Sequence, residues 1–151
     1  MTNITHYLFR CASCRTRNRI PAALAGQPGK CGKCGAVLKT SDLFLQQPIM
    51  LTDANFADKV LRSPIPVLVD CWAPWCSACS MVGPVIAALA TEYKGRFRIG
   101  KLNVDANPLT ANRYDTRSIP ILLIFDNGRL RDTLVGAMPK PEIVRRMRAF
   151  L

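Results

Sequence analysis

The sequence lacks any long apolar run, and its first 40 residues contain no acid. No stretch of about 18 residues is free of charges and helix breakers, which excludes a transmembrane helix and predicts no membrane association. Residues 1–10 show no basic segment followed by an apolar core, so we expect no secretory signal. There is no internal repeat or low-complexity tract, and a hydrophobic content of 49% argues against a mainly disordered chain.

The missing acids mark a change in composition along the chain. Residues 1–40 hold seven of the 21 Lys and Arg residues, whereas the remainder holds 14 bases and all 10 acids. This change places a boundary near residues 41–48. We therefore expect a small basic module at residues 1–45 and a main domain at residues 46–151.

Seven cysteines are present, and an odd number argues against a fully paired disulfide framework. Without an export signal, we expect metal ligands or redox groups in a reducing compartment, the cytoplasm. Two Cys-x2-Cys pairs separated by sixteen residues have the spacing of a two-knuckle zinc site, with the ligands Cys11, Cys14, Cys31 and Cys34.

Four thiolates complete a tetrahedral zinc site, so this pattern predicts one structural zinc and not a catalytic one. Gly32 and Gly35 flank the second knuckle, where a positive φ is useful. The alternatives are two disulfides or four unused thiols. With the ligands complete, His6 is expected to be a surface residue. The basic charge also suggests a nucleic-acid-binding ribbon, but few aromatic residues are available to stack on bases, which disfavours this alternative.

The main domain alternates short apolar runs with helical patterns. Thr52 or Asp53 can cap a helix that carries Phe56, Val60 and Leu61. Buried strands are predicted at residues 67–69, 97–104 and 121–125, and Asn127-Gly128 predicts a hairpin to residues 130–135. Helical patterns cover residues 82–93, 108–114 and 143–150. The order predicts an α/β sandwich with a mixed sheet.

A third Cys-x-x-Cys, Cys76 and Cys79, lies between a buried strand and a helix. Cys76 should sit at the helix N-terminus, where free N–H groups and the dipole favour a thiolate. Cys76 is then the nucleophile that attacks a disulfide, and Cys79, one turn on and more covered, resolves the mixed disulfide. Asp70 directly follows the buried strand, so its pKa should be raised and it can accept a proton from Cys79.

The sequence disfavours two other uses of these cysteines. The spacing of Cys71, Cys76 and Cys79 matches three ligands of a plant-type iron–sulfur site, but no fourth cysteine follows. A second zinc site at Cys76 and Cys79 lacks partners for the same reason. Cys71 is expected to be a buried core thiol.

The segment Val69-Asp-Cys-Trp-Ala-Pro-Trp-Cys-Ser-Ala-Cys79 resembles the active-site segment of the thioredoxin family, and the resemblance extends over residues 48–151. Further similar landmarks follow in order: Lys101–Asp105, Ser118–Pro120, Phe125–Gly128 and Val135–Ala137. The four N-terminal cysteines and the segment Gly136–Lys140 resemble the bacterial subtype that carries a zinc ribbon.

The resemblance implies the thioredoxin fold and protein-disulfide reductase activity. It implies that Ile119–Pro120 is a cis peptide beside the dithiol and that the Ile119 backbone pairs with an extended substrate segment. Trp75, Pro120 and Gly136 would rim an apolar docking patch, and Lys101 would tune Asp70. Disulfide-containing proteins are the implied substrates, and an NADPH-dependent flavoprotein reductase supplies electrons, so no organic cofactor is expected in this chain, which we expect to be a monomer.

Three changes, at four positions, depart from the family pattern. Ser77-Ala78 replaces the usual Gly-Pro between the cysteines, Ser80 replaces a basic residue, and Cys71 replaces an aromatic residue. The first two changes affect the helix start and its charge, and hence the reduction potential and reductase recognition. A redox-inert interaction module is the alternative function, and the intact Cys76 and Cys79 argue against it.

Overall fold

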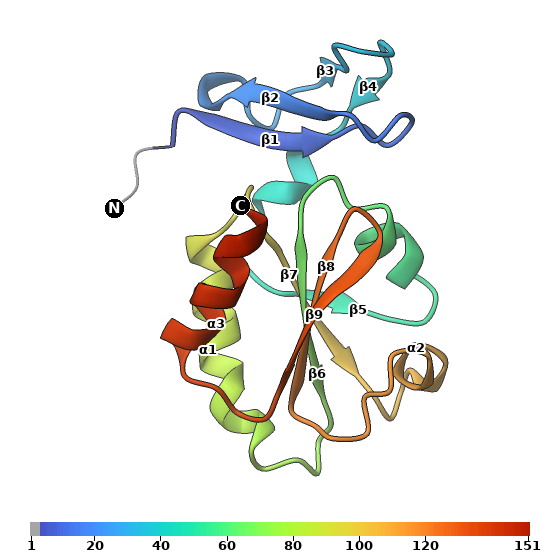
Figure 1. Cartoon of the computed structure of the whole chain (residues 1–151), viewed down its shortest axis with the longest axis vertical. Helices are drawn as coiled ribbons and strands as arrows, with labels where there is room; N and C mark the ends of the chain where they lie inside the picture. The colour runs from blue at the N-terminus through green and yellow to red at the C-terminus, as the bar shows by residue number, and fades with distance from the viewer. Residues whose placement is uncertain (1–3) are drawn as a thin grey trace.

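The computed structural model describes residues 4–151 (Figure 1). A small β-rich module lies at one end of the molecule, and a larger unit of strands and helices forms the rest. The first three residues of the expected zinc module and of the segment 1–10 lie outside the described residues. None of the helices in residues 4–151 combines the length and apolar character needed to cross a bilayer.

A five-stranded mixed sheet forms the centre of the larger unit. The sequence predicts four of these strands but not the short one at Ile49–Leu51. The order of the strands is β5-β7-β6-β8-β9. Their bounds are β5 (Ile49–Leu51), β6 (Val67–Trp72), β7 (Arg98–Asn103), β8 (Ile121–Asp126) and β9 (Arg129–Val135). Strands β5, β6 and β7 are parallel, whereas β8 is antiparallel to both of its neighbours. Asn127 and Gly128 both have positive φ, as the predicted hairpin turn requires.

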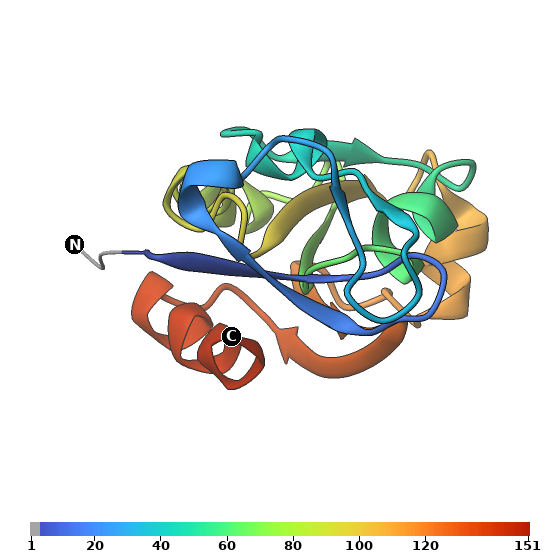
Figure 2. The same ribbon diagram turned by 90° about the horizontal axis from the view of Figure 1, so that it is seen from above.

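Helices cover both faces of this sheet (Figures 1 and 2). On one side lie α1 (Cys79–Glu92) and α3 (Lys140–Met147), which a 3₁₀ turn at Arg148–Phe150 extends. On the other side lie α2 (Pro108–Arg113) and a helical turn at Ala57–Leu61. Leu68 of β6 packs in the same cluster as Ile86 of α1, whereas Val69 packs with Val60 on the other face. Because side chains alternate along a strand, Asp70 faces the same side as Leu68, towards α1.

The first helix of the main domain is shorter than its apolar pattern predicts. The regular helical segment begins at Ala57, after one preceding turn. In this turn Thr52 Oγ1 accepts the N–H of Asn55 at 3.1 Å, which is the capping bond that the sequence predicts for Thr52. Asp53 does not cap this helix. Its carboxylate accepts the N–H groups of Leu109 and Thr110, at 3.3 and 2.8 Å, and so caps α2.

The N-terminal module, residues 4–45 of the structure, consists of two small antiparallel sheets. The first pairs β1 (His6–Arg10) with β2 (Arg17–Pro21), and the second pairs β3 (Gly29–Lys30) with β4 (Val37–Leu38). Short 3₁₀ turns follow at Ala22–Leu24 and Ser41–Phe44. The module sits over the end of the sheet at which β6 begins (Figure 1).

The boundary segment near residues 41–48 packs between the two parts. Leu43 is buried together with Phe9 of β1 and Ile65, which precedes β6. The Phe44 ring meets the Tyr7 ring edge to face at 5.0 Å between centroids. This apolar cluster buries side chains from both parts, because neither part covers them alone.

Polar contacts join the same two parts. Arg15 donates to the carbonyl oxygens of Arg62 and Ser63, at 3.3 and 3.1 Å, and to Asn127 Oδ1 at 2.9 Å. The backbone N–H of Arg10 donates to the carbonyl of Pro64 at 2.8 Å. The N-terminal module is therefore held against the main domain by side-chain and backbone bonds as well as by the apolar cluster.

Candidate functional site

Cys76 and Cys79 form a disulfide at the junction between β6 and α1, with their Cα atoms 5.4 Å apart. Strand β6 ends at Trp72, and a turn of the chain carries Cys76 to the start of the helix. The sequence predicts Cys76 at the helix N-terminus, but α1 begins three residues later, at Cys79. The intervening residues form 3₁₀-type turns, in which the N–H of Cys79 donates to the carbonyl of Cys76 at 3.2 Å.

The helix start nevertheless acts on the Cys76 sulfur. The N–H of Cys79 also lies 3.2 Å from Cys76 Sγ. A free N–H group at the first turn favours a negative charge on this sulfur once the disulfide is reduced. Cys76 is half-buried, whereas Cys79 is only 7% exposed. This difference matches the expectation that Cys79 is the more covered thiol.

Asp70 lies behind Cys79. It is 1% exposed, and it lines a cavity of about 230 Å³ together with both cysteines and Lys101. Its Oδ1 has no hydrogen-bond partner among residues 4–151. Burial raises the pKa of Asp70 to about 6, while the positive charge of Lys101 lowers it in part.

Lys101 is the neighbour of Asp70 in the parallel pairing of β6 with β7. Its ammonium group lies 5.1 Å from the centroid of the Trp72 ring, which is the geometry of a cation–π contact. No ion pair within 4.0 Å joins Lys101 to Asp70, so the lysine acts on the carboxylate through the cavity and not by direct contact.

The Ile119–Pro120 peptide bond is cis, as the resemblance implies. It precedes β8, and the pairing of Ile121 with Cys71 places it level with the end of β6. Neither the N–H nor the C=O of Ile119 bonds to another backbone group in residues 4–151. Gly136 has φ +91° and donates its N–H to the carbonyl of Pro120 at 2.9 Å.

The expected docking rim is less uniform than the resemblance implies. Trp75 is 67% exposed, but Pro120 is buried and Gly136 is half-buried. The exposed apolar surface therefore comes mainly from Trp75. Its indole Nε1 donates to Asp105 Oδ2 at 2.9 Å. The sequence pattern alone does not mark Asp105 as a site residue, although it ends the Lys101–Asp105 landmark.

The four N-terminal cysteines come together in the N-terminal module. All four Sγ atoms lie within 4.8 Å of one another, with Cys11 and Cys34 at 3.5 Å and Cys14 and Cys31 at 3.6 Å. Sulfurs around a tetrahedral zinc at ~2.3 Å are about 3.8 Å apart, so this arrangement fits such an ion. None of the four forms a disulfide.

The two knuckles have the same backbone pattern. In each, the N–H two residues after the first cysteine points at its sulfur: Ser13 to Cys11 and Lys33 to Cys31, both at 3.4 Å. The N–H of Cys34, and then the side chain of Asn18, lower the pKa of Cys31 to about 6. These donors favour the thiolates that a metal needs.

The residue after each knuckle has positive φ: Arg15 at 63° and Gly35 at 76°. The expectation of a positive φ is confirmed at Gly35, but Gly32 does not have one. Gly32 instead donates its N–H to Asn18 Oδ1 at 2.9 Å.

Two further single residues lie where the sequence predicts. Cys71 is fully buried, and this burial, with the nearby Asp70 charge, raises its thiol pKa. His6 is exposed and does not belong to the cluster of four cysteines. Its ring nitrogen contacts Thr5 and Arg19.

An oxidisable Cys-x-x-Cys at the end of a central strand, on a mixed sheet covered by helices, defines the class of thiol–disulfide oxidoreductases. The comparisons with known proteins agree. The thioredoxin family model matches residues 47–149. The chain belongs to the thioredoxin family, and its first 46 residues lie outside this match.

Relatives from three bacteria are similar over 60–67% of the chain. A thioredoxin of Synechocystis sp. is 46% identical over 101 residues, which covers 67% of this chain and 94% of the relative. Thioredoxin 1 of Synechococcus elongatus is 52% identical over 90 residues, covering 60% and 84%. Thioredoxin 2 of Chlorobaculum tepidum is 50% identical over 96 residues, covering 64% and 88%.

Proposed function

We propose that this chain reduces disulfide bonds of other proteins. The Cys76 thiolate attacks one sulfur of a substrate disulfide, which forms a mixed disulfide and releases one substrate thiolate. Cys79 then loses its proton and attacks Cys76 Sγ, which releases the second substrate thiolate and leaves the Cys76–Cys79 disulfide. The observation that carries this proposal is that disulfide itself, with the Cys79 N–H directed at Cys76 Sγ.

Asp70 is proposed as the acceptor of the Cys79 proton. Both groups line one cavity, which is large enough to hold water that passes the proton between them. A pKa of about 6 leaves Asp70 mostly ionised at neutral pH and still able to accept a proton. Lys101 tunes this pKa through its charge.

We propose that the substrate docks beside the disulfide as an extended segment. The unpaired Ile119 backbone offers a donor and an acceptor to such a strand, as in strand addition. Trp75 supplies the exposed apolar contact, and Pro120 and Gly136 shape the backbone next to it.

The N-terminal cysteines are proposed to hold one structural zinc, which would cross-link the two knuckles and supply no chemistry of its own. Four ligands leave no open position. A zinc module at residues 1–45 followed by a thioredoxin domain at residues 46–151 supports assignment of this chain to the zinc-containing bacterial subtype, thioredoxin 2. The family model begins at residue 47, which fits this division.

The remaining proposals concern partners and compartment. Electrons would come from NADPH through a flavoprotein thioredoxin reductase, and the protein would work as a cytoplasmic monomer, where thiolates stay reduced. Nucleic acid is not the proposed partner. Arg10 and Arg15 turn towards the main domain, so the seven bases of the N-terminal module do not form one exposed face.

Reduction of insulin disulfides with NADPH and a thioredoxin reductase tests the proposal. Wild type should turn over, and Cys76→Ser should not, because no nucleophile remains. Cys79→Ser should trap covalent mixed disulfides through Cys76, because the resolving thiol is missing. Turnover by Cys76→Ser, or no trapped partner with Cys79→Ser, would show that the two roles are wrongly assigned.

A further inference from the structure

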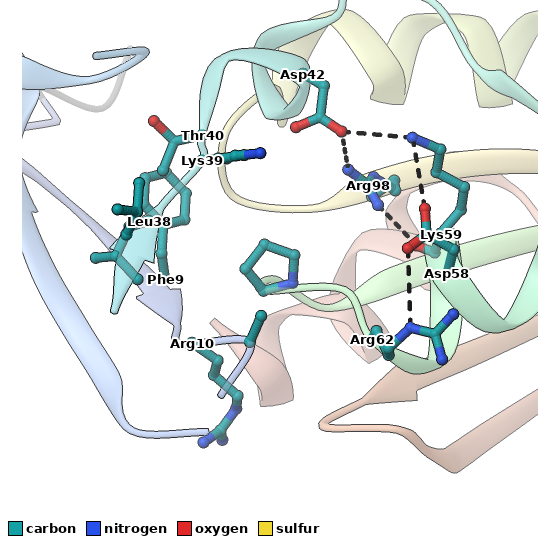
Figure 3. A pocket seen from close by; sticks show the side chains of 13 residues that line it. Phe9, Arg10, Leu38, Lys39, Thr40, Asp42, Asp58, Lys59, Arg62 and Arg98 are labelled. Carbon is teal, nitrogen blue, oxygen red and sulfur yellow. Dashed lines mark hydrogen bonds and ion pairs between the residues drawn. The ribbon is translucent and has the colours of Figure 1, made fainter. Parts of the chain in front are cut away.

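A cleft of about 370 Å³ lies between the N-terminal module and the main domain, away from the dithiol (Figure 3). Its lining includes five cationic residues and two acidic ones: Arg10, Lys39, Lys59, Arg62, Arg98, Asp42 and Asp58. Apolar atoms form the rest of the lining, mainly from Phe9, Val37, Leu38 and Pro64. We name this the basic cleft.

One of these cations has a structural role. Arg98 is 8% exposed and donates to the carbonyl of Lys59 at 2.8 Å and to Asp42 Oδ2 at 3.0 Å. It thus ties the turn at Ser41–Phe44 to the main domain. Because both contacts are good hydrogen bonds, Arg98 and Asp42 largely neutralise each other.

Three of the other four cations are held loosely. Lys39 is exposed and forms no ion pair within residues 4–151. Arg62 is exposed and approaches Asp58 only at 3.8 Å, and Lys59 approaches Asp42 and Asp58 at 3.6 and 4.0 Å. Exposed pairs at such distances contribute little to stability, so these cations remain free to bind an anion.

The cations of the basic cleft are arranged to bind a ligand with separated negative charges better than a compact anion. In Figure 3, Arg10 and Arg62 lie at one end of the cleft, and Lys39 lies towards the other end, with Phe9 and Leu38 beside the space between. Asp126, 4.0 Å from Arg10, offsets part of the charge at the first end. A compact phosphate bound at Arg62 would also lie near Asp58, whose Oδ1 is 3.8 Å from Arg62 Nε.

The apolar surface between the cations favours an extended peptide over a nucleic acid as the ligand. Val37 is 58% exposed at the edge of the cleft, whereas the Phe9 ring is fully buried and offers no face for base stacking. A nucleic acid would therefore lack the stacking contact that single-strand binding uses. An extended peptide places apolar and charged side chains at regular intervals along its length.

We propose that the basic cleft binds an acidic, extended segment of a partner protein, with an apolar side chain against Val37 and Pro64 and carboxylates facing Lys39 and Arg62. The absence of acids from the first 40 residues adds a long-range field that attracts such a segment. This site does not depend on the dithiol chemistry.

Fluorescence anisotropy of the full-length, metal-loaded protein tests the site. The probe is a labelled eight-residue peptide of alternating glutamate and leucine. It should bind wild type, and the Lys39→Gln/Arg62→Gln variant should weaken binding by about fivefold or more. The matched control, Lys30→Gln/Arg129→Gln, removes two exposed cations outside the cleft and should change binding less than about twofold.

Three outcomes would overturn the proposal. These are no binding of the acidic peptide, equal weakening in both double variants, and binding of a single-stranded oligonucleotide of eight nucleotides at least as tightly as the peptide. Insulin reduction by all three proteins should be the same, since none of the four positions is near Cys76. A loss of peptide binding with normal reduction is therefore separable from a failure of the proposed reductase activity.

Discussion

Asp70 shows how position changes the chemistry of a single residue. A carboxylate in the middle of a central strand is costly when ionised, and the structure gives its Oδ1 no partner within residues 4–151. The residue nevertheless lies beside the dithiol, where a proton must be taken up and returned. We therefore expect the protein to lose stability by keeping this group.

Replacing Asp70 with Asn should raise the free energy of unfolding of the oxidised protein at pH 8 but not at pH 4. Burial raises the pKa from its usual 3.8 to about 6. The contribution of the protonated Asp70 to the free energy of unfolding is therefore fully present below pH 4 and is lost as the pH rises through 6. The full effect, an upper bound, is about 3 kcal/mol. Denaturant titrations at both pH values measure it.

Asp58→Asn is the control, because its side chain is 65% exposed. Its effect should stay below about 0.5 kcal/mol at either pH. If Asp70→Asn stabilises the protein equally at pH 4 and pH 8, improved packing and not ionisation would be responsible, and the assignment of a raised pKa would be wrong.

Ala78 is the second residue with a distinct consequence. It precedes α1 with φ −64°, which proline also adopts, and its N–H makes no backbone hydrogen bond in residues 4–151. From the resemblance to the family, in which proline is usual at this position, we expect proline to support a more reducing dithiol. We expect wild type to be tens of millivolts less negative than the roughly −270 mV typical of thioredoxin.

Ala78→Pro should then make the reduction potential more negative. Equilibration with glutathione, followed by mass spectrometry of the peptide that contains Cys76 and Cys79, measures the potential in the full-length protein. Ala87→Ser, on the exposed face of α1, serves as a control that should leave it unchanged. A wild-type value at or below the thioredoxin value, or no change on Ala78→Pro, would contradict the argument.

At the scale of elements, the two cysteine knuckles work as a pair. Each is a tight turn whose N–H groups point at sulfur, and each is too small to have an apolar core of its own. A cross-link between them replaces the missing core, which is why a module of this size needs a metal or disulfides.

The purified chain should contain one zinc, and the Cys11→Ser/Cys14→Ser variant should contain none, because two thiolates do not form a stable tetrahedral site. The loss should also lower the unfolding temperature of the N-terminal module. Metal analysis of the reduced protein and a thermal unfolding scan measure both. Cys71→Ala, in the core of the main domain, should retain the zinc. Stoichiometric zinc in the double variant would disprove the ligand assignment.

Across the whole molecule, β6 separates the two chemical sites. The strand begins beside the N-terminal module and ends at the loop that carries Cys76 (Figure 1). Six residues at ~3.3 Å each span about 17–20 Å. Any effect of the N-terminal module on the dithiol must therefore pass through the fold or through a shared partner and not through contact.

Gly95 lies at the junction of the two parts, and Gly95→Ala should disturb their packing. A Cβ there would collide with the Phe44 ring and lie 2.8 Å from Tyr7 Cε1, and φ is +80°. Gly26→Ala is the matched control, since its φ is +84° but the space around it is open. Both should lose roughly 1–2 kcal/mol through backbone strain. Gly95→Ala should lose about 1–3 kcal/mol more through overpacking.

Denaturant unfolding of both variants gives the difference, and limited proteolysis near residues 45–48 reports whether the two parts separate. Equal losses in the two variants would mean that the aromatic rings move aside at no cost. In that case the cluster of Tyr7, Phe9 and Phe44 would not hold the N-terminal module in place.

Much of the molecule follows from local sequence signals. The buried strands, the Asn127-Gly128 turn and the α/β class depend on apolar periodicity and turn residues, which act over a few residues. The Cys-x2-Cys spacing likewise brings the sulfurs of each knuckle together, because two intervening residues close one tight turn. The dithiol could be recognised from its place between a strand and a helix.

Other features depend on residues that are distant in the sequence, so only the tertiary structure decides them. The role of Asp53 as a cap for α2 depends on a contact between residues that are 57 positions apart in the sequence. The raised pKa of Asp70 requires the helix that covers it. The docked linker and the basic cleft exist only because Arg15, Leu43 and Arg98 meet groups from the other part of the chain. Burial and charge at these positions are properties of the assembled surfaces, which no short stretch of sequence contains.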